Sequence, residues 1–163
     1  MKNLLIIRGR PASGKTFWLN EHNLIISVIS PDDIRAKLCK YTHSMEFAWR
    51  PDVTWAYVEA EVRHKMHDGD FIVLDAQDSD YEKWTKLAAQ YDYKVWYKEM
   101  DTPEDVCMTR NSLRGHGKGQ LPDDVMLAAF KWLDEHPVPA EWEQLPDDID
   151  PFKFFYIDRG EKK

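Results

Sequence analysis

The sequence predicts an α/β fold: a doubly wound parallel sheet of about five strands with flanking helices and a short lid. Two observations lead to this prediction. Apolar runs of strand length alternate with segments of helical periodicity from residue 4 to the C-terminal region. The first run, Leu4–Ile7, leads through a loop with two glycines into a helical pattern. Because parallel strands need helical crossovers, this alternation favours a parallel sheet over hairpins.

The composition limits the class of protein. A chain of 163 residues with 43% hydrophobic residues suits a single domain spanning residues 1–163. Cys39 and Cys107 lie in no metal-binding or redox spacing, which favours a reducing cytosol. No apolar run suits a signal peptide or a membrane span, so we expect a cytoplasmic protein that has no membrane partner. The net charge of -7 argues against a nucleic-acid binder with a generally basic surface, and the oligomeric state stays open.

Residues 9–16 have the spacing G-x-x-x-x-G-K-[ST] of a phosphate-binding loop. Gly9 and Gly14 permit backbone dihedrals that turn successive N–H groups toward phosphates at the N-terminus of a helix. Lys15 would add a positive charge, and the Thr16 hydroxyl would hold Mg²⁺. The loop therefore predicts an ATP and Mg²⁺ site. Its expected nucleotide-binding residues are Gly9, Pro11, Ala12, Ser13, Gly14, Lys15 and Thr16.

The next elements complete a β-α-β unit within the first thirty residues. The helix that begins at Lys15 should end at residues 21–23, where Asn23 suits a C-cap. The apolar run Leu24–Ile29 then predicts the second strand.

A second helix is predicted from Pro31 through Leu38, because proline and acidic residues favour a first helical turn. Asp32 and Arg35 are three residues apart and therefore share a face at its N-terminus. That position lies beyond the carboxyl end of a strand, where ligands bind to open α/β sheets.

A third helix and a third strand follow. Residues 40–51 show no clear period and are a candidate rim of the substrate site. Residues 52–67 predict a helix, since apolar side chains recur at helical spacing. Phe71–Asp75 then has the form of a Walker B strand, in which Asp75 would hold Mg²⁺ directly or through water. The alternative is a strand that merely ends in a turn-forming Asp. The core stripe of the helix is Trp55, Val58, Val62 and Met66.

Ser79 is predicted to cap the next helix, and Tyr93–Met100 to form the fourth strand. Thr102 and Asp105 have the spacing of a capping box that opens a helix through about Asn111.

Basic and glycine residues gather after this helix. Arg110 and Arg114 lie on one side if the helix persists, and residues 112–121 contain three glycines. Mobility next to arginines suits a lid that closes over a transferring phosphate. The alternative is a surface loop with incidental charge.

The C-terminal part contains one more helix and an unusual extension. A helix begins at Pro122, and residues 135–163 form a proline-rich extension in which Phe152–Ile157 predicts a fifth strand. The expected core face of the helix is Val125, Ala129, Phe130 and Leu133. Five strands alternating with helices, with the phosphate loop after the first, indicate a P-loop NTPase-type sheet of the kinase kind.

With these residues the chain resembles a known family, the phage polynucleotide 5′-kinases and their relatives among the small P-loop kinases. The resemblance concerns the kinase domain only and covers about residues 1–133. It depends on Gly9–Thr16, on Ser30–Arg35 and on Arg110–Gly115.

The resemblance implies roles for single residues. Asp32 would take the proton of the 5′-hydroxyl group, and Arg35 would bind the acceptor-side phosphate. Arg114 would bind the donor phosphates, and Arg110 stands where the family carries another basic residue. The expected catalytic residues are therefore Lys15, Asp32, Arg35 and Arg114, with the 5′ end of a nucleic acid as the substrate partner.

Two other functions fit the same residues. Relatives of this family include kinases that act on modified bases in phage DNA, nucleosides, antibiotics and sugars, and all of them share the phosphate loop. A regulatory module that binds ATP without catalysis is an alternative of a different class. Such a module needs no carboxylate aimed at an acceptor hydroxyl, so the Asp32/Arg35 pair favours an enzyme.

Overall fold

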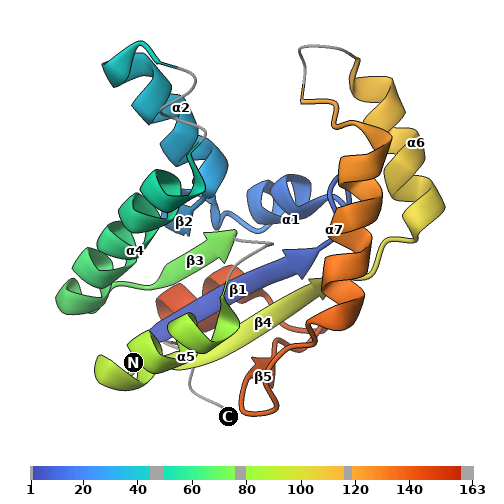
Figure 1. Cartoon of the computed structure of the whole chain (residues 1–163). Coiled ribbons are helices and arrows are strands. Elements are labelled where there is room, and N and C mark those ends of the chain that lie inside the picture. The colour runs from blue at the N-terminus through green and yellow to red at the C-terminus, as the bar shows by residue number, and fades with distance from the viewer. Residues whose placement is uncertain (1, 45–49, 76–79, 116–118, 159–163) are drawn as a thin grey trace.

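A computed structural model describes residues 2–44, 50–75, 80–115 and 119–158. Its five strands form one parallel sheet in the order β2-β3-β1-β4-β5, which confirms the predicted fold class (Figure 1). The strands are β1 (Asn3–Gly9), β2 (Val28–Ile29), β3 (Ile72–Asp75), β4 (Lys94–Met100) and β5 (Glu143–Gln144). The chain runs from β1 first to β2 on one side and later to β4 on the other. The strand order therefore reverses at β1, the place where open α/β sheets bind ligands.

Helices cover both faces of this sheet. The α-helices are α1 (Lys15–Glu21), α2 (Pro31–Thr42), α4 (Pro51–Asp68), α5 (Tyr81–Gln90), α6 (Glu104–Arg114) and α7 (Asp123–Glu135). Two short segments, the 3₁₀ helix η1 (Ile25–Ser27) and the π-helix η2 (Lys153–Ile157), complete the fold. None of the described helices combines the length and the apolar character needed to cross a membrane.

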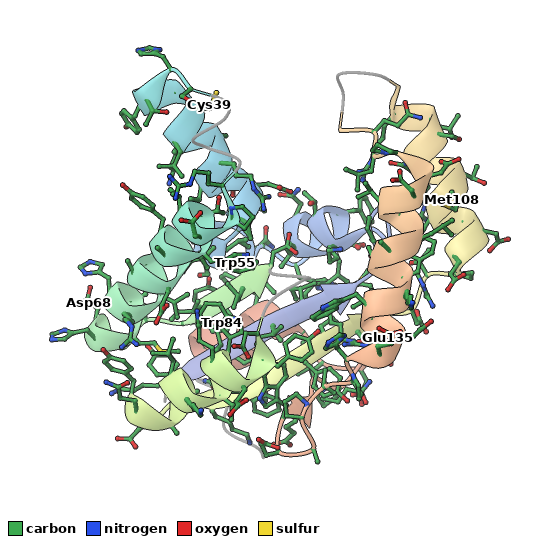
Figure 2. The ribbon with its side chains drawn as sticks, in the orientation of Figure 1. Cys39, Trp55, Asp68, Trp84, Met108 and Glu135 are labelled. Atoms are coloured by element: carbon green, nitrogen blue, oxygen red, sulfur yellow. The ribbon has the colours of Figure 1, made fainter. Side chains whose placement is uncertain are left out.

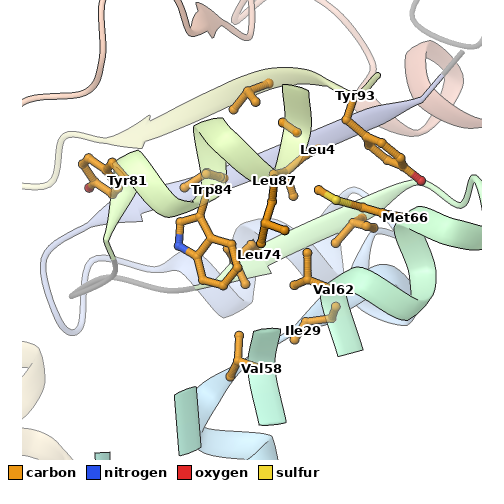
Figure 3. Packing of buried hydrophobic residues seen from close by; sticks show 14 of the residues in the cluster. Leu4, Ile29, Val58, Val62, Met66, Leu74, Tyr81, Trp84, Leu87 and Tyr93 are labelled. Atoms are coloured by element: carbon orange, nitrogen blue, oxygen red, sulfur yellow. The ribbon is translucent and has the colours of Figure 1, made fainter. Parts of the chain in front are cut away.

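The core has two halves, because the side chains of β1 alternate between the two faces. Leu4 and Ile6 pack with α4 and α5, whereas Leu5 and Ile7 pack with α1 and the C-terminal segment. Both halves are almost fully buried, as expected for a central parallel strand. Figure 3 shows the first half, in which the predicted α4 residues Val58, Val62 and Met66 are fully buried.

Trp55, the fourth residue of the predicted α4 stripe, is only partly buried. Its ring lies beside that of Trp84 in α5, with centroids 6.4 Å apart (Figure 2). The α4 stripe therefore ends in Trp55, which lies at the border of the core against the buried Trp84.

The second strand is shorter than predicted. Asn23 adopts a left-handed φ of 57°, and the chain then forms η1, so that only Val28 and Ile29 pair with β3. Ile26 remains 79% exposed, because this part of the apolar run is a helical turn rather than a buried strand. Apolar composition alone did not distinguish the two conformations.

The predicted fifth strand at Phe152–Ile157 is wrong. These residues are helical, and β5 is formed instead by Glu143 and Gln144 at the edge beside β4. Asp150 starts the helical segment, since its carboxylate accepts hydrogen bonds from the backbone N–H groups of Phe152 (3.0 Å) and Lys153 (3.3 Å). The aromatic run favours a strand, whereas the Asp-Pro pair before it favours a helix start, and the helix start prevails.

Two predicted helix starts also need correction. Ser79 lies outside the described residues, and Asp80 is the N-cap of α5, accepting from the Lys83 N–H at 3.3 Å. The predicted capping box does not form, because α6 begins after Pro103 and the Thr102 side chain bonds elsewhere.

The core face of α7 is shifted from the prediction, and the predicted Ala129 is only partly buried. Val125 is 43% exposed, and its neighbour Met126 is fully buried with Phe130 and Leu133. The helix begins at Asp123, and Met126 and Phe130 pack with Cys107 of α6.

Candidate active site

The loop between β1 and α1 has the backbone of a phosphate-binding loop. Ala12 and Gly14 adopt left-handed φ values of 63° and 97°. The Ser13 N–H donates to the carbonyl oxygen of Arg10 at 3.1 Å, which closes the turn. Gly9 is required for another reason, since a Cβ atom there would lie 2.7 Å from the Cβ atom of Met100 in β4. The loop therefore lies directly against the neighbouring strand.

Lys15 curls back over this loop. Its Nζ donates to the carbonyl oxygens of Gly9 (3.0 Å) and Arg10 (3.1 Å). Thr16 follows in the first turn of α1 and is exposed. A cation and a hydroxyl group thus lie side by side in sequence at the start of α1, as phosphate and Mg²⁺ binding would require.

Asp75 ends β3 beside the loop, because its Cα is the register partner of Ile7 in β1. Burial raises the pKa of this carboxyl group, Asp32 and Asp33 raise it further, and Lys15 lowers it. Asp75 therefore lies within electrostatic range of Lys15 in the phosphate loop and of Asp32 and Asp33 in the first turn of α2.

Thr16 and Asp75 suit Mg²⁺ by the chemistry of their oxygen atoms. Among the described residues, no group of three or more His, Cys, Asp or Glu side chains could hold a metal ion. A magnesium ion in a nucleotide site takes one or two protein oxygens and completes its shell with phosphate oxygens and water. A hydroxyl and a single carboxylate are therefore a sufficient protein contribution.

Asp32 and Arg35 are brought together by α2. Ser30 caps this helix by accepting from the Asp33 N–H, and Pro31 occupies its first turn. The Asp32 carboxylate accepts from Nη1 of Arg35 at 2.8 Å and is 87% exposed at the side-chain level. The pair predicted to act on the acceptor is thus an ion pair on the solvent side of the helix start.

The two lid arginines differ in position. Nη1 of Arg110 lies 3.5 Å from the carbonyl oxygen of Ala12 and 3.6 Å from the position of a Cβ atom at Gly14, so Arg110 stands over the loop. Arg114 is exposed and donates to the carbonyl oxygen of Gly119 at 3.5 Å. The structure therefore brings Arg110, rather than Arg114, into contact with the phosphate loop.

The predicted lid at residues 112–121 lies between α6 and α7, and its residues 116–118 fall outside the described residues. The buried Asn111 closes the base of this hairpin. Its side chain accepts from the Leu121 N–H at 2.9 Å and donates to the Leu121 carbonyl oxygen at 2.8 Å. In Figure 1, α2 and the α6–α7 hairpin rise on opposite sides of α1, so the two groups of predicted residues flank the loop.

Two residues at the loop were not predicted to take part. Arg10 donates to the carbonyl oxygen of Thr102 at 2.9 Å, and the Thr102 hydroxyl donates to the carbonyl oxygen of Ser13 at 2.8 Å. The sequence held a signal for Thr102, which follows the carboxyl end of the strand beside β1. It held none for Arg10, because the loop motif leaves that position free.

Comparison with known proteins identifies the family of this chain. Residues 4–136 match the sequence profile of the family described as AAA domain. The chain belongs to this AAA domain family. The solved structures that resemble it include a Chloroflexus aurantiacus protein assigned provisionally as a kinase, with a TM-score of 0.68, 15% identity and 99% coverage of both chains.

Two further solved structures that resemble this chain are of named kinases. A sugar kinase from a Janibacter species gives a TM-score of 0.60 at 14% identity, covering 89% of this chain and 84% of the other. A gluconokinase from Sinorhizobium meliloti gives 0.54 at 12% identity, covering 88% and 82%. At these identities the likeness concerns the fold, which is that of P-loop kinases.

Proposed function

We propose that this chain transfers the γ-phosphoryl group of ATP to a hydroxyl group of a small molecule. The observation that carries this proposal is the arrangement at the phosphate loop: Lys15 bonds to its carbonyl oxygens, Arg110 contacts it at Ala12, and Asp75 ends the strand beside it. Groups suited to a donor phosphate, a metal ion and an acceptor proton thus share one edge of the sheet.

Each residue has a role in this proposal. Lys15 and Arg110 bind donor phosphate oxygens, where negative charge is largest. Thr16 and Asp75 hold Mg²⁺, which neutralises charge on the phosphates when bound. Asp32 accepts the proton of the acceptor hydroxyl, and its exposed carboxylate leaves an oxygen accessible to substrate. Arg114 reaches the phosphates only if the lid moves, since it contacts Gly119 in this structure.

A small acceptor is favoured by the charge and by the structural neighbours. The net charge of -7 disfavours a polyanionic substrate outside the immediate site. Two neighbours of the same fold are named gluconokinase and sugar kinase. Their names support the class of a polyhydroxylated acceptor without fixing its identity.

A second candidate is the 5′-hydroxyl end of DNA or RNA. Arg35 favours it, because a guanidinium beside the proposed base suits an acceptor that carries its own phosphate. A neutral sugar has no phosphate for Arg35, and the ion pair with Asp32 would then serve only to orient the base.

A transfer screen separates these functions. Purified protein with radiolabelled ATP and Mg²⁺ is offered sugars, sugar acids, nucleosides, 3′-phosphorylated nucleosides, and 5′-hydroxyl DNA and RNA. We expect label on a neutral or carboxylated polyol, lost in Asp32→Asn. Label only on oligonucleotides and 3′-phosphorylated nucleosides, with a raised KM in Arg35→Ala, would favour the second candidate. ATP binding without transfer to any acceptor would favour a regulatory module.

A further inference from the structure

Arg10 contacts both helices of the α6–α7 hairpin, although it lies in the phosphate loop. Besides its bond to the Thr102 carbonyl oxygen (2.9 Å), its Nη2 lies 3.7 Å from a carboxylate oxygen of Glu104 at the start of α6. Its guanidinium also lies over the ring of Phe130 in α7, 5.8 Å from the centroid. The side chain is only 25% exposed. One arginine of the loop thus contacts the beginning of α6 and the middle of α7.

Other contacts attach the same hairpin to β1 and the loop. The Thr102 hydroxyl donates back to the carbonyl oxygen of Ser13, so two hydrogen bonds of opposite sense join residues 10–13 to Thr102. At the other end, Arg8 donates to the carbonyl oxygens of Leu133 (2.6 Å) and His136, the last of which follows α7. The two neighbours of Gly9 therefore hold both ends of the hairpin: Arg10 bonds before the start of α6, and Arg8 bonds at the end of α7.

These anchors determine the position of Arg110. Arg110 and Glu104 belong to the same helix, so a helix held at its first turn fixes the direction in which Arg110 points. Arg110 contacts the loop at the carbonyl oxygen of Ala12. Ala12 lies between Arg10 and Ser13, the two loop residues that hydrogen-bond to Thr102. Displacing the start of α6 would move the Arg110 guanidinium away from the loop.

We infer that Arg10 is a positioning residue that holds α6 so that Arg110 stays over the donor phosphates. The inference rests on the proposed function in one respect, namely that Arg110 binds those phosphates. A planar guanidinium suits this task, because it bonds to Thr102, approaches Glu104 and lies over the ring of Phe130 at once. A lysine at the same position would keep the charge but lose this combination.

A double-mutant cycle on nucleotide binding tests the inference. The dissociation constant of a non-hydrolysable ATP analogue with Mg²⁺ is measured by calorimetry for the wild type, Arg10→Gln, Arg10→Lys, Arg110→Gln and the double variant Arg10→Gln/Arg110→Gln. We expect Arg110→Gln to weaken binding about 10- to 100-fold, and both Arg10 variants about 10-fold. The double variant should bind within about twofold of Arg110→Gln, since residues that act through one group are not additive.

Two more variants test whether the loss of binding is specific to the contacts of Arg10 and Thr102. Arg63→Gln removes another ion-paired arginine, on α4, and should leave binding unchanged. Thr102→Val keeps the side-chain shape but removes the hydroxyl bond to Ser13, and it should weaken binding several-fold, again only while Arg110 is present. Melting temperatures of all variants show whether a loss of binding reflects unfolding.

Different failures have different meanings. Additive effects of Arg10→Gln and Arg110→Gln, or full binding in Arg10→Lys, would overturn the positioning role while leaving the proposed function intact. If Arg10→Gln does not fold, Thr102→Val decides the question by the same criterion. A wild-type protein that binds no ATP analogue would contradict the proposed function and this inference together.

Discussion

Lys15 is held by the loop that it would serve. A lysine ammonium has three N–H donors and needs acceptors when it is partly buried, and the carbonyl oxygens of Gly9 and Arg10 supply two of them. Both carbonyl groups belong to the loop itself. The ammonium is therefore held against the loop that would bind phosphate before any ligand arrives.

Lys15→Ala should remove phosphoryl transfer while leaving the fold intact. A well-placed electrostatic group at the transferring phosphate contributes about 10² to 10³ in rate, and Lys15 belongs to none of the hydrophobic core clusters that the described residues form. Turnover in the best acceptor assay and the melting temperature are the measurements. Wild-type turnover in a folded Lys15→Ala protein would contradict the kinase proposal.

Asp75→Asn should stabilise the protein at neutral pH when ATP and Mg²⁺ are absent. Burial raises the pKa of Asp75 above its usual value of 3.8. Between the unfolded and the folded pKa the folded state binds more protons, so the free energy of unfolding falls as pH rises through this window and stays reduced above it. Asparagine carries no charge and removes this cost.

Thermal melts from pH 3 to pH 8 test this prediction. The difference in melting temperature between Asp75→Asn and the wild type should be small at the acid end and grow with pH. The variant should also lose the extra stability that the wild type gains from Mg²⁺ and an ATP analogue. A variant less stable than the wild type at pH 7 would mean that Asp75 is held by contacts that favour its charge.

Residues with an obligatory backbone or charge role were predictable from the sequence. The loop motif identifies Gly9, Gly14 and Lys15, because the physical demand on each position is strict. The position of Asp75 was predictable because it ends a buried strand, and its role in holding Mg²⁺ stays a prediction. The role of Arg10 was not, since it depends on where α6 and α7 lie in space.

At the scale of elements, the long helices α2 and α4 were predicted well, while two helix caps and the edge strands were predicted poorly. The range Pro31–Thr42 contains the predicted α2, and α4 follows the predicted residues 52–67 within one residue at each end. β2 and β5 are two residues long and lie at the two edges of the sheet. The position of such a strand is determined by pairing with its single neighbouring strand, and two residues are too few to show a hydrophobic alternation in the sequence.

The lid is expected to be ordered by nucleotide. Gly115 and Gly119 adopt positive φ values of 74° and 84°, and no atom lies within 4 Å of a Cβ position at either. The contact of Arg114 with Gly119, at 3.5 Å, is long for a hydrogen bond. Phosphates would offer this arginine a stronger, charge-assisted partner.

Hydrogen exchange of residues 112–121 measures this ordering. We expect slower exchange with an ATP analogue and Mg²⁺, while α5, on one face of the sheet away from the loop, should exchange at an unchanged rate. Equal exchange of residues 112–121 in both states would contradict a lid and support a static surface loop. Arg114→Ala should abolish part of the added protection if this arginine closes the lid.

For the whole molecule, the C-terminal segment is part of the core rather than an appendage. The ring of Phe155 stacks on Phe71 with centroids 4.4 Å apart and contacts the edge of Trp96, which is fully buried in β4. The Tyr156 hydroxyl bonds to the Ser27 side chain, which connects the segment to η1. In Figure 1 this segment lies behind β1 and β4. It covers the face of the sheet opposite α4 and α5.

Phe155→Ala should therefore lower the free energy of unfolding by about 3 to 5 kcal/mol, as expected when a buried aromatic ring is deleted from a core. Ile157→Ala is the matched control in the same segment, because Ile157 is 62% exposed, and it should cost less than about 0.5 kcal/mol. Urea unfolding at constant pH measures both. A small effect of Phe155→Ala would mean that the sheet is stable without this cover, and that the predicted kinase core ends at α7. A large effect would extend the folded unit to residue 157, beyond the residues 4–136 that match the family.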